Sequence, residues 1–250
     1  MTSLAQSSVK KDIPTVTTPD IETWSVSIKD IRNNDGLRLD ATHYDREATL
    51  AVQALENSGH TLKPLSDLAD VRLPGQFTRI WAKGPEHGYR YINGSELINI
   101  SGLGALEKEP RYLSKLTKTK IDKLIIHEGW ILVTCSGTIG RVLYVSKRFE
   151  GWAATHDLIR VVPHSPNHLG YLHAYLSSPI AQAQILGHTH GGQIDHITHH
   201  QLKTIIVPVL SEREMTRIHE KTLASLIARD EAVVKLVDIS AVLNKHLEQK

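Results

Sequence analysis

Cysteine is nearly absent from this chain of 250 residues, which contains a single one, Cys135. One cysteine cannot form an internal disulfide, so a disulfide framework is excluded and a reducing compartment is favoured. Cys135 lies in an apolar segment with no base beside it in sequence, which favours a small buried residue over a nucleophile. Long hydrophobic runs are also missing: no segment approaches the roughly 18 apolar residues of a membrane span, and residues 1–11 do not resemble a signal peptide. We therefore expect a cytoplasmic protein.

The sequence motifs of common enzyme classes are missing as well. The chain has no Gly-x-x-x-x-Gly-Lys-Ser/Thr phosphate loop, no Gly-x-Gly-x-x-Gly dinucleotide turn, no Gly-x-Ser-x-Gly elbow and no cysteine pair for zinc. It also lacks the Asn/Asp-Pro-Pro-Tyr/Phe/Trp segment of amino-methyltransferases and the acidic pair plus lysine of metal-dependent nucleases. These absences predict a protein without catalytic residues, cofactor or metal of its own.

Histidine is the one remaining candidate for chemistry, with fifteen residues in the chain. Five of them fall within thirteen positions: His188, His190, His196, His199 and His200. Closely spaced histidines can bind a metal ion. However, adjacent residues on a helix face about 100° apart, and Asp195 is the only carboxylate nearby. The pattern favours a surface or DNA-facing cluster, and a metal-dependent enzyme that uses residues 188–200 stays as an alternative.

Charge is distributed unevenly along the chain, although the net charge is only +2. Residues 1–60 contain six Lys/Arg against nine Asp/Glu, residues 61–210 sixteen against eleven, and residues 211–250 seven against seven. The middle region therefore has a net charge of +5, which is compatible with contacts to phosphate and equally with a solvated surface.

The chain divides into three expected parts. Residues 1–60 read as an N-terminal arm, with a possible strand at 24–28, followed by a helix at 41–57. Residues 61–210 alternate short strands with turns and then contain two helices, at 168–177 and 179–186, which indicates a mixed α+β domain. A capping box at Thr198 begins a short helix, and a last strand at 204–207 is expected to stop at Pro208. Residues 211–250 read as one long helix.

The central feature of the middle region is the segment 129–141, Gly-Trp-Ile-Leu-Val-Thr-Cys-Ser-Gly-Thr-Ile-Gly-Arg. It reads as a strand, a tight polar turn and the start of a second strand. Its glycines let the backbone approach another molecule closely, and its hydroxyls and Arg141 suit phosphate or guanine. An ordinary hairpin whose glycines only satisfy the turn geometry would have the same sequence.

The long helix begins at a second capping box, Ser211 to Glu214, and contains no proline or glycine. Its apolar residues recur every three, four, seven or eight positions and form one narrow, coiled-coil-like stripe along about 55 Å. The stripe consists of Ile218, Leu226, Val233, Leu236, Leu243 and Leu247. We expect it to pack on another long helix, from this chain, from a second copy or from a partner.

Five short segments occur in a fixed order before this helix: GWILVTCSGTIGR at 129–141, HDLIRV at 156–161, GYLHAYLSSP at 170–179, QIDHIT at 193–198 and LKTIIVP at 202–208. In this order, and followed by a long helix rich in glutamate, they closely resemble the DNA specificity subunit of type I restriction-modification systems. The resemblance covers about residues 62–250, and RLDATHYD at 38–45 looks like the entry to such a domain.

The resemblance implies a DNA reader that is not an enzyme. Residues 61–210 would be a target-recognition domain that binds one half of a split site in double-stranded DNA. Residues 211–250 would be a spacer helix on which an adenine-N6 DNA methyltransferase subunit docks, with a restriction translocase as a further possible partner. The family usually has two recognition domains and two spacer helices, whereas this sequence has one of each. It is therefore like a half-subunit. Such a chain either forms a homodimer through the C-terminal helix or serves a system that has one recognition domain per assembly.

Turns are the places from which we expect base contacts, because they project side chains from a rigid scaffold. The predicted DNA-binding residues are Gln76, Thr78, Arg79, Lys83, Ser136, Thr138, Arg141, His190 and Gln193. Arginine and glutamine can read bases through paired hydrogen bonds, whereas Lys, Ser and Thr more often contact phosphate. A different setting for the same reader, a methylation-associated phage-defence assembly without a type I nuclease, stays open.

Overall fold

The computed structural model describes residues 23–32, 39, 44, 46–96, 110–118, 120–189 and 196–247. The chain divides into two compact units, residues 1–37 and 38–250. The first unit contains the short helix α1 (Ile28–Arg32). The strand expected at residues 24–28 is wrong, since residues 23–27 have no regular secondary structure and Ile28 begins the helix. A strand needs a partner for its N–H and C=O groups, and no described strand pairs with this segment.

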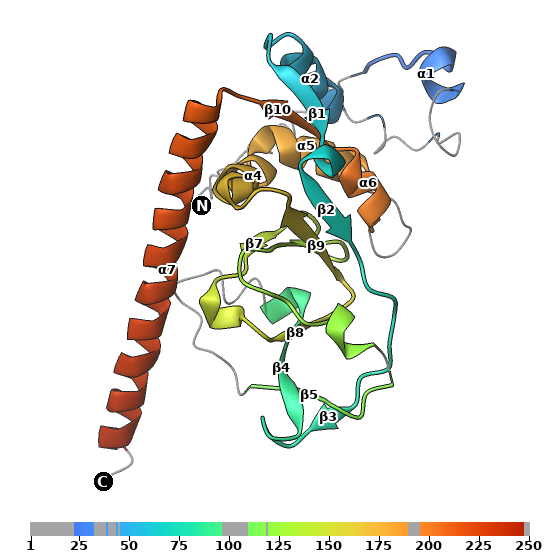
Figure 1. Cartoon of the computed structure of the whole chain (residues 1–250). Coiled ribbons are helices and arrows are strands. Elements are labelled where there is room, and N and C mark those ends of the chain that lie inside the picture. Colours follow the sequence, from blue (N-terminus) through green and yellow to red (C-terminus); the bar gives the residue numbers. More distant parts are fainter. Residues whose placement is uncertain are drawn as a thin grey trace, which may run out of the picture. The chain divides into compact units, whose positions relative to one another are not determined.

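The second unit is a mixed α+β domain that ends in a long helix, as the sequence predicts (Figure 1). Its main sheet is antiparallel, in the order β2 (Ala69–Arg72), β9 (Leu158–Pro163), β6 (Ile131–Thr134) and β7 (Val142–Tyr144). The strands β6 and β7 confirm the predicted hairpin, with Ile131 opposite Tyr144 and Val133 opposite Val142. All four residues of β6 are buried, because layers of side chains cover both faces of the sheet.

The two faces of the main sheet belong to two hydrophobic clusters. Ile131 and Val133 point into a core that also contains residues of the helices, whereas Leu132 between them points into a second cluster with Phe149. The helices around this unit are α2 (Arg46–Glu56), α4 (Leu169–Leu176), α5 (Pro179–Gly187), α6 (His199–Lys203) and α7 (Glu212–Leu247). Short 3₁₀ helices occur at Leu65–Asp67 (η2), Ile121–Lys123 (η3), Lys147–Phe149 (η4) and Pro166–His168 (η5).

A second, smaller sheet lies below the first in Figure 1. Its order is β3 (Trp81–Ala82), β5 (Tyr112–Ser114), β4 (Gly88–Ile92) and β8 (Ala153–Ala154), with only the β4–β8 pair parallel. Gly88 is required in this sheet, because a Cβ there would lie 2.7 Å from the carbonyl oxygen of Leu113. The small sheet brings the segments around residues 80, 92 and 112 next to one another.

A pair of strands, β1 (Thr61–Pro64) and β10 (Ile206–Val209), connects the two ends of the domain. The strand expected at 204–207 is therefore displaced, and Pro208 lies within it instead of stopping it. Proline is accepted here because side chains, and not a third strand, cover the outer edge of β10. Tyr171 donates a hydrogen bond to the carbonyl of Pro208, and Gln184 both accepts from the N–H of Ile206 and donates to its carbonyl.

The predicted starts of three helices are confirmed. The hydroxyl of Ser178 accepts a hydrogen bond from the N–H of Ala181 at the start of α5. Thr198 and Gln201 form the reciprocal capping box of α6, and the hydroxyl of Ser211 accepts from the N–H of Glu214 at the start of α7. These caps depend on residues three positions apart, so local sequence is enough to predict them.

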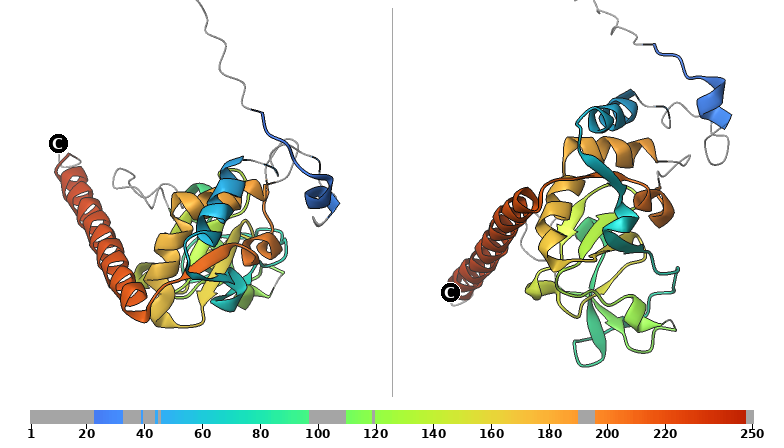
Figure 2. Two further views of the ribbon diagram at one scale, coloured as in Figure 1. Left: turned by 90° about the horizontal axis from the view of Figure 1, so that it is seen from above. Right: turned by 45° about the horizontal axis from the view of Figure 1, so that its top comes forward.

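The first half of α7 packs on its own domain. Met215, Leu226 and Val233 are buried, and Ser146 donates a hydrogen bond to the buried carboxylate of Asp230. The contact with α4 is close: a Cβ on Gly170 would lie 2.8 Å from the Cα of His219. The C-terminal part of α7 projects from the domain, as the left view of Figure 2 shows, and beyond Val233 the side chains of Leu243 and Leu247 are 57% and 65% exposed. No helix in the described ranges is both long and apolar enough to cross a membrane.

His173 is the most perturbed histidine at the contact between α4 and α7. It is 8% exposed, and burial together with the nearby Arg229 lowers its pKa to about 4. Its Nε2 atom has no hydrogen-bond partner among the described residues. The folded protein therefore holds this ring neutral.

Acidification should destabilise the fold through His173. An unfolded chain binds a proton at this residue near its ordinary pKa of 6.5, whereas the folded state binds it only near 4. Stability is therefore lost as the pH falls through this window, by up to about 3 kcal/mol. Urea unfolding at about pH 7 and about pH 4.5 should show this loss, and His173→Asn should reduce it. An equal loss in both proteins would show that other groups are responsible.

Candidate nucleic-acid interface

The loop between β6 and β7 is held rigidly from within. The hydroxyl of Thr134 donates to the carbonyl of Thr138 at 2.5 Å and accepts from the N–H of Arg141 at 2.9 Å. Gly137 and Gly140 have φ angles of 70° and 83°, in the left-handed region that favours glycine. From outside the loop, the side-chain amide of Gln182 on α5 donates to the carbonyl of Gly140 at 2.9 Å. The loop thus presents its hydroxyl groups from a fixed backbone.

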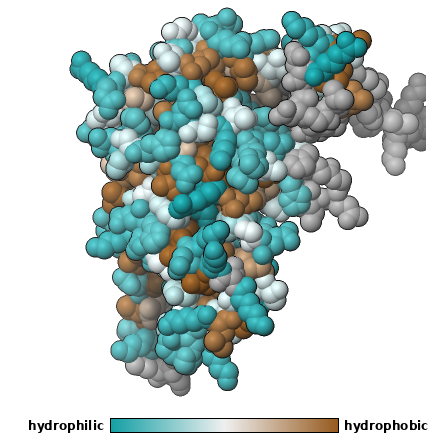
Figure 3. All heavy atoms as spheres, turned by 45° about the vertical axis from the view of Figure 1, so that its right-hand side comes forward, coloured by the Kyte–Doolittle hydropathy of each residue, from teal (hydrophilic) through white to brown (hydrophobic). Residues whose placement is uncertain are grey.

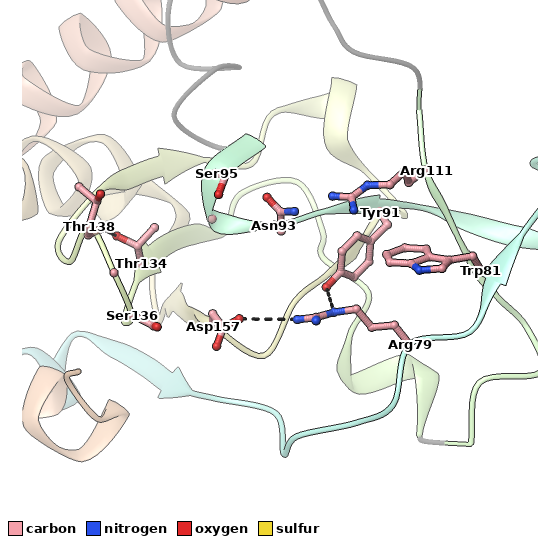
Figure 4. Close-up of a pocket in the computed structure, with 12 residues that line it drawn as sticks. Arg79, Trp81, Tyr91, Asn93, Ser95, Arg111, Thr134, Ser136, Thr138 and Asp157 are labelled. Atoms are coloured by element: carbon pink, nitrogen blue, oxygen red, sulfur yellow. Dashed lines mark hydrogen bonds and ion pairs between the residues drawn. The ribbon is translucent and has the colours of Figure 1, made fainter. Parts of the chain in front are cut away.

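A cavity of about 430 Å³ lies beside this loop (Figure 4). Parts of the chain that are far apart in sequence meet there: the connection from β2 to β3, the end of β4, the residue before β5, the hairpin loop and the residue before β9. The lining includes two arginines, one carboxylate, two aromatic rings and several small polar groups. These are Arg79, Arg111, Asp157, Trp81, Tyr91, Asn93, Ser95, Thr134, Ser136 and Thr138.

Arg79 is oriented by three groups in this cavity. Its Nε donates to the hydroxyl of Tyr91 at 2.8 Å, and its Nη2 donates to the hydroxyl of Thr155 at 3.1 Å. The same Nη2 lies 3.7 Å from the carboxylate of Asp157. The ion pair is partly exposed, with side-chain exposures of 38% and 39%. Arg79 is therefore positioned in advance and still accessible to a ligand.

Aromatic rings and a second arginine line the cavity on the same side as Arg79, across from the hairpin residues Ser136 and Thr138 (Figure 4). Trp81 and Tyr91 meet edge to face at 5.2 Å between centroids, and the guanidinium of Arg111 lies 5.0 Å from the Trp81 ring centre. Arg111 also forms an ion pair with Glu96 at 2.9 Å. Planar groups of this kind can stack on bases or contact them at their edges.

Asp157 is positioned by a buried arginine behind it. Arg160, only 1% exposed, donates hydrogen bonds to the backbone carbonyls of Ala154 and Thr155, each at 2.7 Å, and to that of Leu158. A fourth bond reaches the carbonyl of Leu124 at 3.3 Å. Burial, with a contribution from Arg72, lowers the pKa of Arg160 to about 10. The turn that presents Asp157 is thus formed around one guanidinium.

The structure brings three of the predicted DNA-binding residues, Arg79, Ser136 and Thr138, to this one cavity. Four others, Gln76, Thr78, Lys83 and Arg141, are exposed but do not line it. His190 and Gln193 lie outside the described residues. Cys135 is buried as expected, and burial with the charge of Asp157 raises the pKa of its thiol to about 11, so it stays protonated at neutral pH.

Sequence reasoning missed Trp81, Tyr91, Asn93, Arg111 and Asp157 in this lining. One local signal was available for Asn93, which begins the turn Asn-Gly-Ser and exchanges capping hydrogen bonds with Glu96. The other four come from strand ends that only the tertiary structure brings together.

The predicted histidine cluster is only partly described. His199 and His200 have ring centroids 4.0 Å apart, and burial together with the charge of His200 lowers the pKa of His199. Within the described ranges, no three His, Cys, Asp or Glu side chains converge as they would around a metal ion.

Comparison with known proteins matches the sequence to one family. The family model described as the type I restriction modification DNA specificity domain matches residues 58–228. No curated protein matches the chain closely enough to count as a relative.

Solved structures with a similar fold include the S subunit of the type I restriction-modification system from M. genitalium, with 20% identity and a TM-score of 0.49 over 76% of this chain and 45% of that one. The HsdS subunit from Thermoanaerobacter tengcongensis matches with 16% identity and a TM-score of 0.47, over 87% of this chain and 54% of that one. The type IIG restriction endonuclease BpuSI matches with 12% identity and a TM-score of 0.48, over 82% of this chain and 34% of that one. The chain therefore spans about half the length of the two subunits.

Proposed function

This chain belongs to the family of the type I restriction modification DNA specificity domain, and we propose that it binds double-stranded DNA in a sequence-specific manner through the cavity around Arg79. The observation that carries the proposal is the convergence of Arg79, Asp157 and the hairpin hydroxyls at one accessible site. A guanidinium can donate two hydrogen bonds to guanine, and a carboxylate accepts from the amino group of cytosine. Ser136 and Thr138 can contact either a base or a phosphate.

The surface of the domain has a character that fits this role. On the face shown in Figure 3, hydrophilic residues cover most of the surface, and the hydrophobic residues form separate patches among them. Interfaces with DNA are more polar than those between proteins. The net charge of +5 for residues 61–210 adds an attraction for phosphate.

In the proposed assembly this chain is the reader and not the catalyst. Residues 61–210 form the target-recognition domain, and residues 211–250 form a spacer helix that docks an adenine-N6 DNA methyltransferase subunit. A restriction or other defence effector can join the same complex. Because one recognition domain reads one half of a split site, a homodimer through the C-terminal helix would read a symmetric site.

Replacing Arg79 with alanine should weaken specific binding by about 1–3 kcal/mol, which is about fivefold to 150-fold, and relax the sequence preference at one base pair. Duplexes selected by the full-length protein from a pool with randomised sequence would reveal the motif. The same selection with Arg79→Ala should return that motif with one position degenerate.

The matched control is Arg213→Ala, which removes the same charge from an exposed position in the first turn of α7. It should leave both the motif and the affinity nearly unchanged. If the wild-type protein selects no motif, or if both variants weaken binding equally, the cavity does not read sequence.

The partner is tested by affinity purification of the tagged protein from its native host, with co-purifying chains identified by mass spectrometry. We expect a methyltransferase chain in near-equal amount. A lone protein with stoichiometric bound zinc or iron would instead favour the metal-dependent enzyme.

A further inference from the structure

A second cavity, of about 300 Å³, lies between the start of the β2–β3 connection and η3. Both segments are on the right-hand side of the domain in Figure 1. Its charged lining residues are Arg72, Lys123, Arg160 and Asp122, and Trp130 with Leu73 and Pro74 completes it. Three cations thus meet one carboxylate, although the whole chain is nearly neutral.

The buried cation in this cavity has an unused donor. Arg160 satisfies its two terminal nitrogens with four backbone carbonyls, but its Nε is buried without a hydrogen-bond partner. No carboxylate within the described ranges lies within ion-pair distance of its guanidinium. A buried charge without a counterion is costly, so an anion in this cavity would gain attraction that is otherwise unused.

The outer cations are placed at the entrance of the same cavity. The guanidinium of Arg72 lies 4.6 Å from the ring centre of Trp130, and both residues line the cavity. Arg72 also forms an ion pair with Asp70 at 3.4 Å, but both side chains are about half exposed, so water screens the pair and an incoming anion can compete for the arginine. Lys123 lies at the last position of η3, beside Asp122.

We infer that this cavity is a phosphate-binding site, in which Arg72 and Lys123 contact the phosphate and Arg160 contributes charge from below. The phosphate is supplied by the DNA backbone, so the inference rests on the proposed function. Phosphate contacts do not read sequence but fix the position and register of a protein on the duplex. The site would thereby position the Arg79 cavity over its bases.

The chain itself links the two cavities. Residues 72–74 line the phosphate site and residue 79 lines the base-reading cavity, so a single extended connection forms part of both. Five residues of extended chain, from 74 to 79, span at most about 18 Å. Arg160 also forms part of the phosphate site while its hydrogen bonds hold the turn that presents Asp157. A phosphate bound in one cavity is thus within a few nucleotides of bases in the other.

The test uses a duplex of arbitrary sequence, because phosphate contacts do not require the target site. The double variant Arg72→Gln with Lys123→Gln should bind about tenfold more weakly at low salt. Its plot of log affinity against log salt should be less steep, with a slope less negative by about 0.9. If both residues hold one phosphate, the double variant should lose about one such contact and not two. The control Lys147→Gln removes a charge from an exposed residue that lines neither cavity, and its slope should not change.

A second measurement separates DNA phosphate from free phosphate. The melting temperatures of the wild-type protein and the double variant are compared in sodium phosphate and in sodium chloride at equal ionic strength, without DNA. Free phosphate is the ligand if two results hold together. The wild-type protein and the variant bind duplex with the same salt slope, and phosphate raises the melting temperature of the wild type but not of the variant. No difference in either measurement overturns the site. If the wild-type protein binds no duplex, the proposed function fails, and the phosphate measurement alone decides whether the cavity binds an anion.

Discussion

Replacing Arg160 with leucine should lower the free energy of unfolding by about 3–5 kcal/mol, the largest effect that we expect from any single substitution in this domain. The side chain is 1% exposed, and its two terminal nitrogens hold four backbone carbonyls. The carbonyl of Leu124 also accepts from the N–H of Ala154. Leucine fills part of the volume but takes from the other three carbonyls the donor that Arg160 supplies, and each buried unsatisfied group costs about 1–3 kcal/mol. Urea unfolding should show this as a lower midpoint with an unchanged slope.

Arg141→Leu is the matched control, because the arginine on the hairpin is exposed. Its stability should stay within about 0.5 kcal/mol of the wild type. An intermediate result is expected for Arg160→Lys, since an ammonium group keeps the charge but cannot reach all four carbonyls. Equal stability of Arg160→Leu and the wild type would mean that the turn at 154–158 does not depend on this guanidinium.

The features that could be predicted from sequence are those in which neighbours along the chain decide the structure. The hairpin of β6 and β7 follows from one run of β-branched residues, a turn with two glycines and a second apolar run. The caps of α5, α6 and α7 each depend on a pair of residues three positions apart. Tertiary packing is not needed to recognise either pattern.

The end of the last strand shows where local rules fail. Proline usually ends a strand because it lacks an N–H group, and this predicts an end before Pro208. At the outer edge of β10, Tyr171 and Gln184 from two helices make hydrogen bonds in place of a neighbouring strand. No described strand there needs the N–H group that Pro208 lacks, so proline costs little at this position. Only the packing of α4 and α5 on this strand decides the result.

The candidate site could be predicted only in part, because tertiary packing decides which side chains meet there. Arg79 follows the Pro74-Gly75 pair and Ser136 begins the glycine-containing hairpin loop, and glycine and proline make such connections recognisable in sequence. Arg111 stands before a short strand with no nearby turn signal, and Asp157 stands within the segment 156–161, which gives no hint of a pocket. The two sheets bring both residues into the same cavity. Arg160 reads in sequence as an interruption in an apolar strand, and its role depends on carbonyls 2 to 36 positions away.

The apolar stripe of α7 has two environments, although its sequence spacing suggests a single one. Leu226 and Val233 are 7% and 4% exposed because they pack on this chain's own domain. Leu236, Leu243 and Leu247 continue the stripe beyond that contact and are 40–65% exposed. We therefore propose that the surface for a second copy or a methyltransferase subunit begins after Val233.

Replacing Leu236, Leu243 and Leu247 together with glutamate should abolish that association while the recognition domain stays folded. Each leucine loses an apolar contact of about 1.5–3 kcal/mol, so the dissociation constant should rise by at least about a hundredfold. Sedimentation velocity for self-association and co-purification for the methyltransferase would measure the loss. Val233→Glu should behave differently, because a buried carboxylate without a partner costs more than about 2 kcal/mol and weakens the fold itself.

The control for charge is Ala241→Glu combined with Lys245→Glu, which makes the same total change of −3 on exposed positions. At 3.6 residues per turn these two positions lie on roughly the opposite side of the helix from the three leucines. If the control also abolishes association, charge on the helix and not the apolar stripe controls binding. If the leucine variant associates like the wild type, α7 beyond Val233 is not the docking surface. Loss of the cooperative unfolding transition in the leucine variant would instead mean that this half of the helix contributes to the stability of the domain, contrary to a spacer that projects from it.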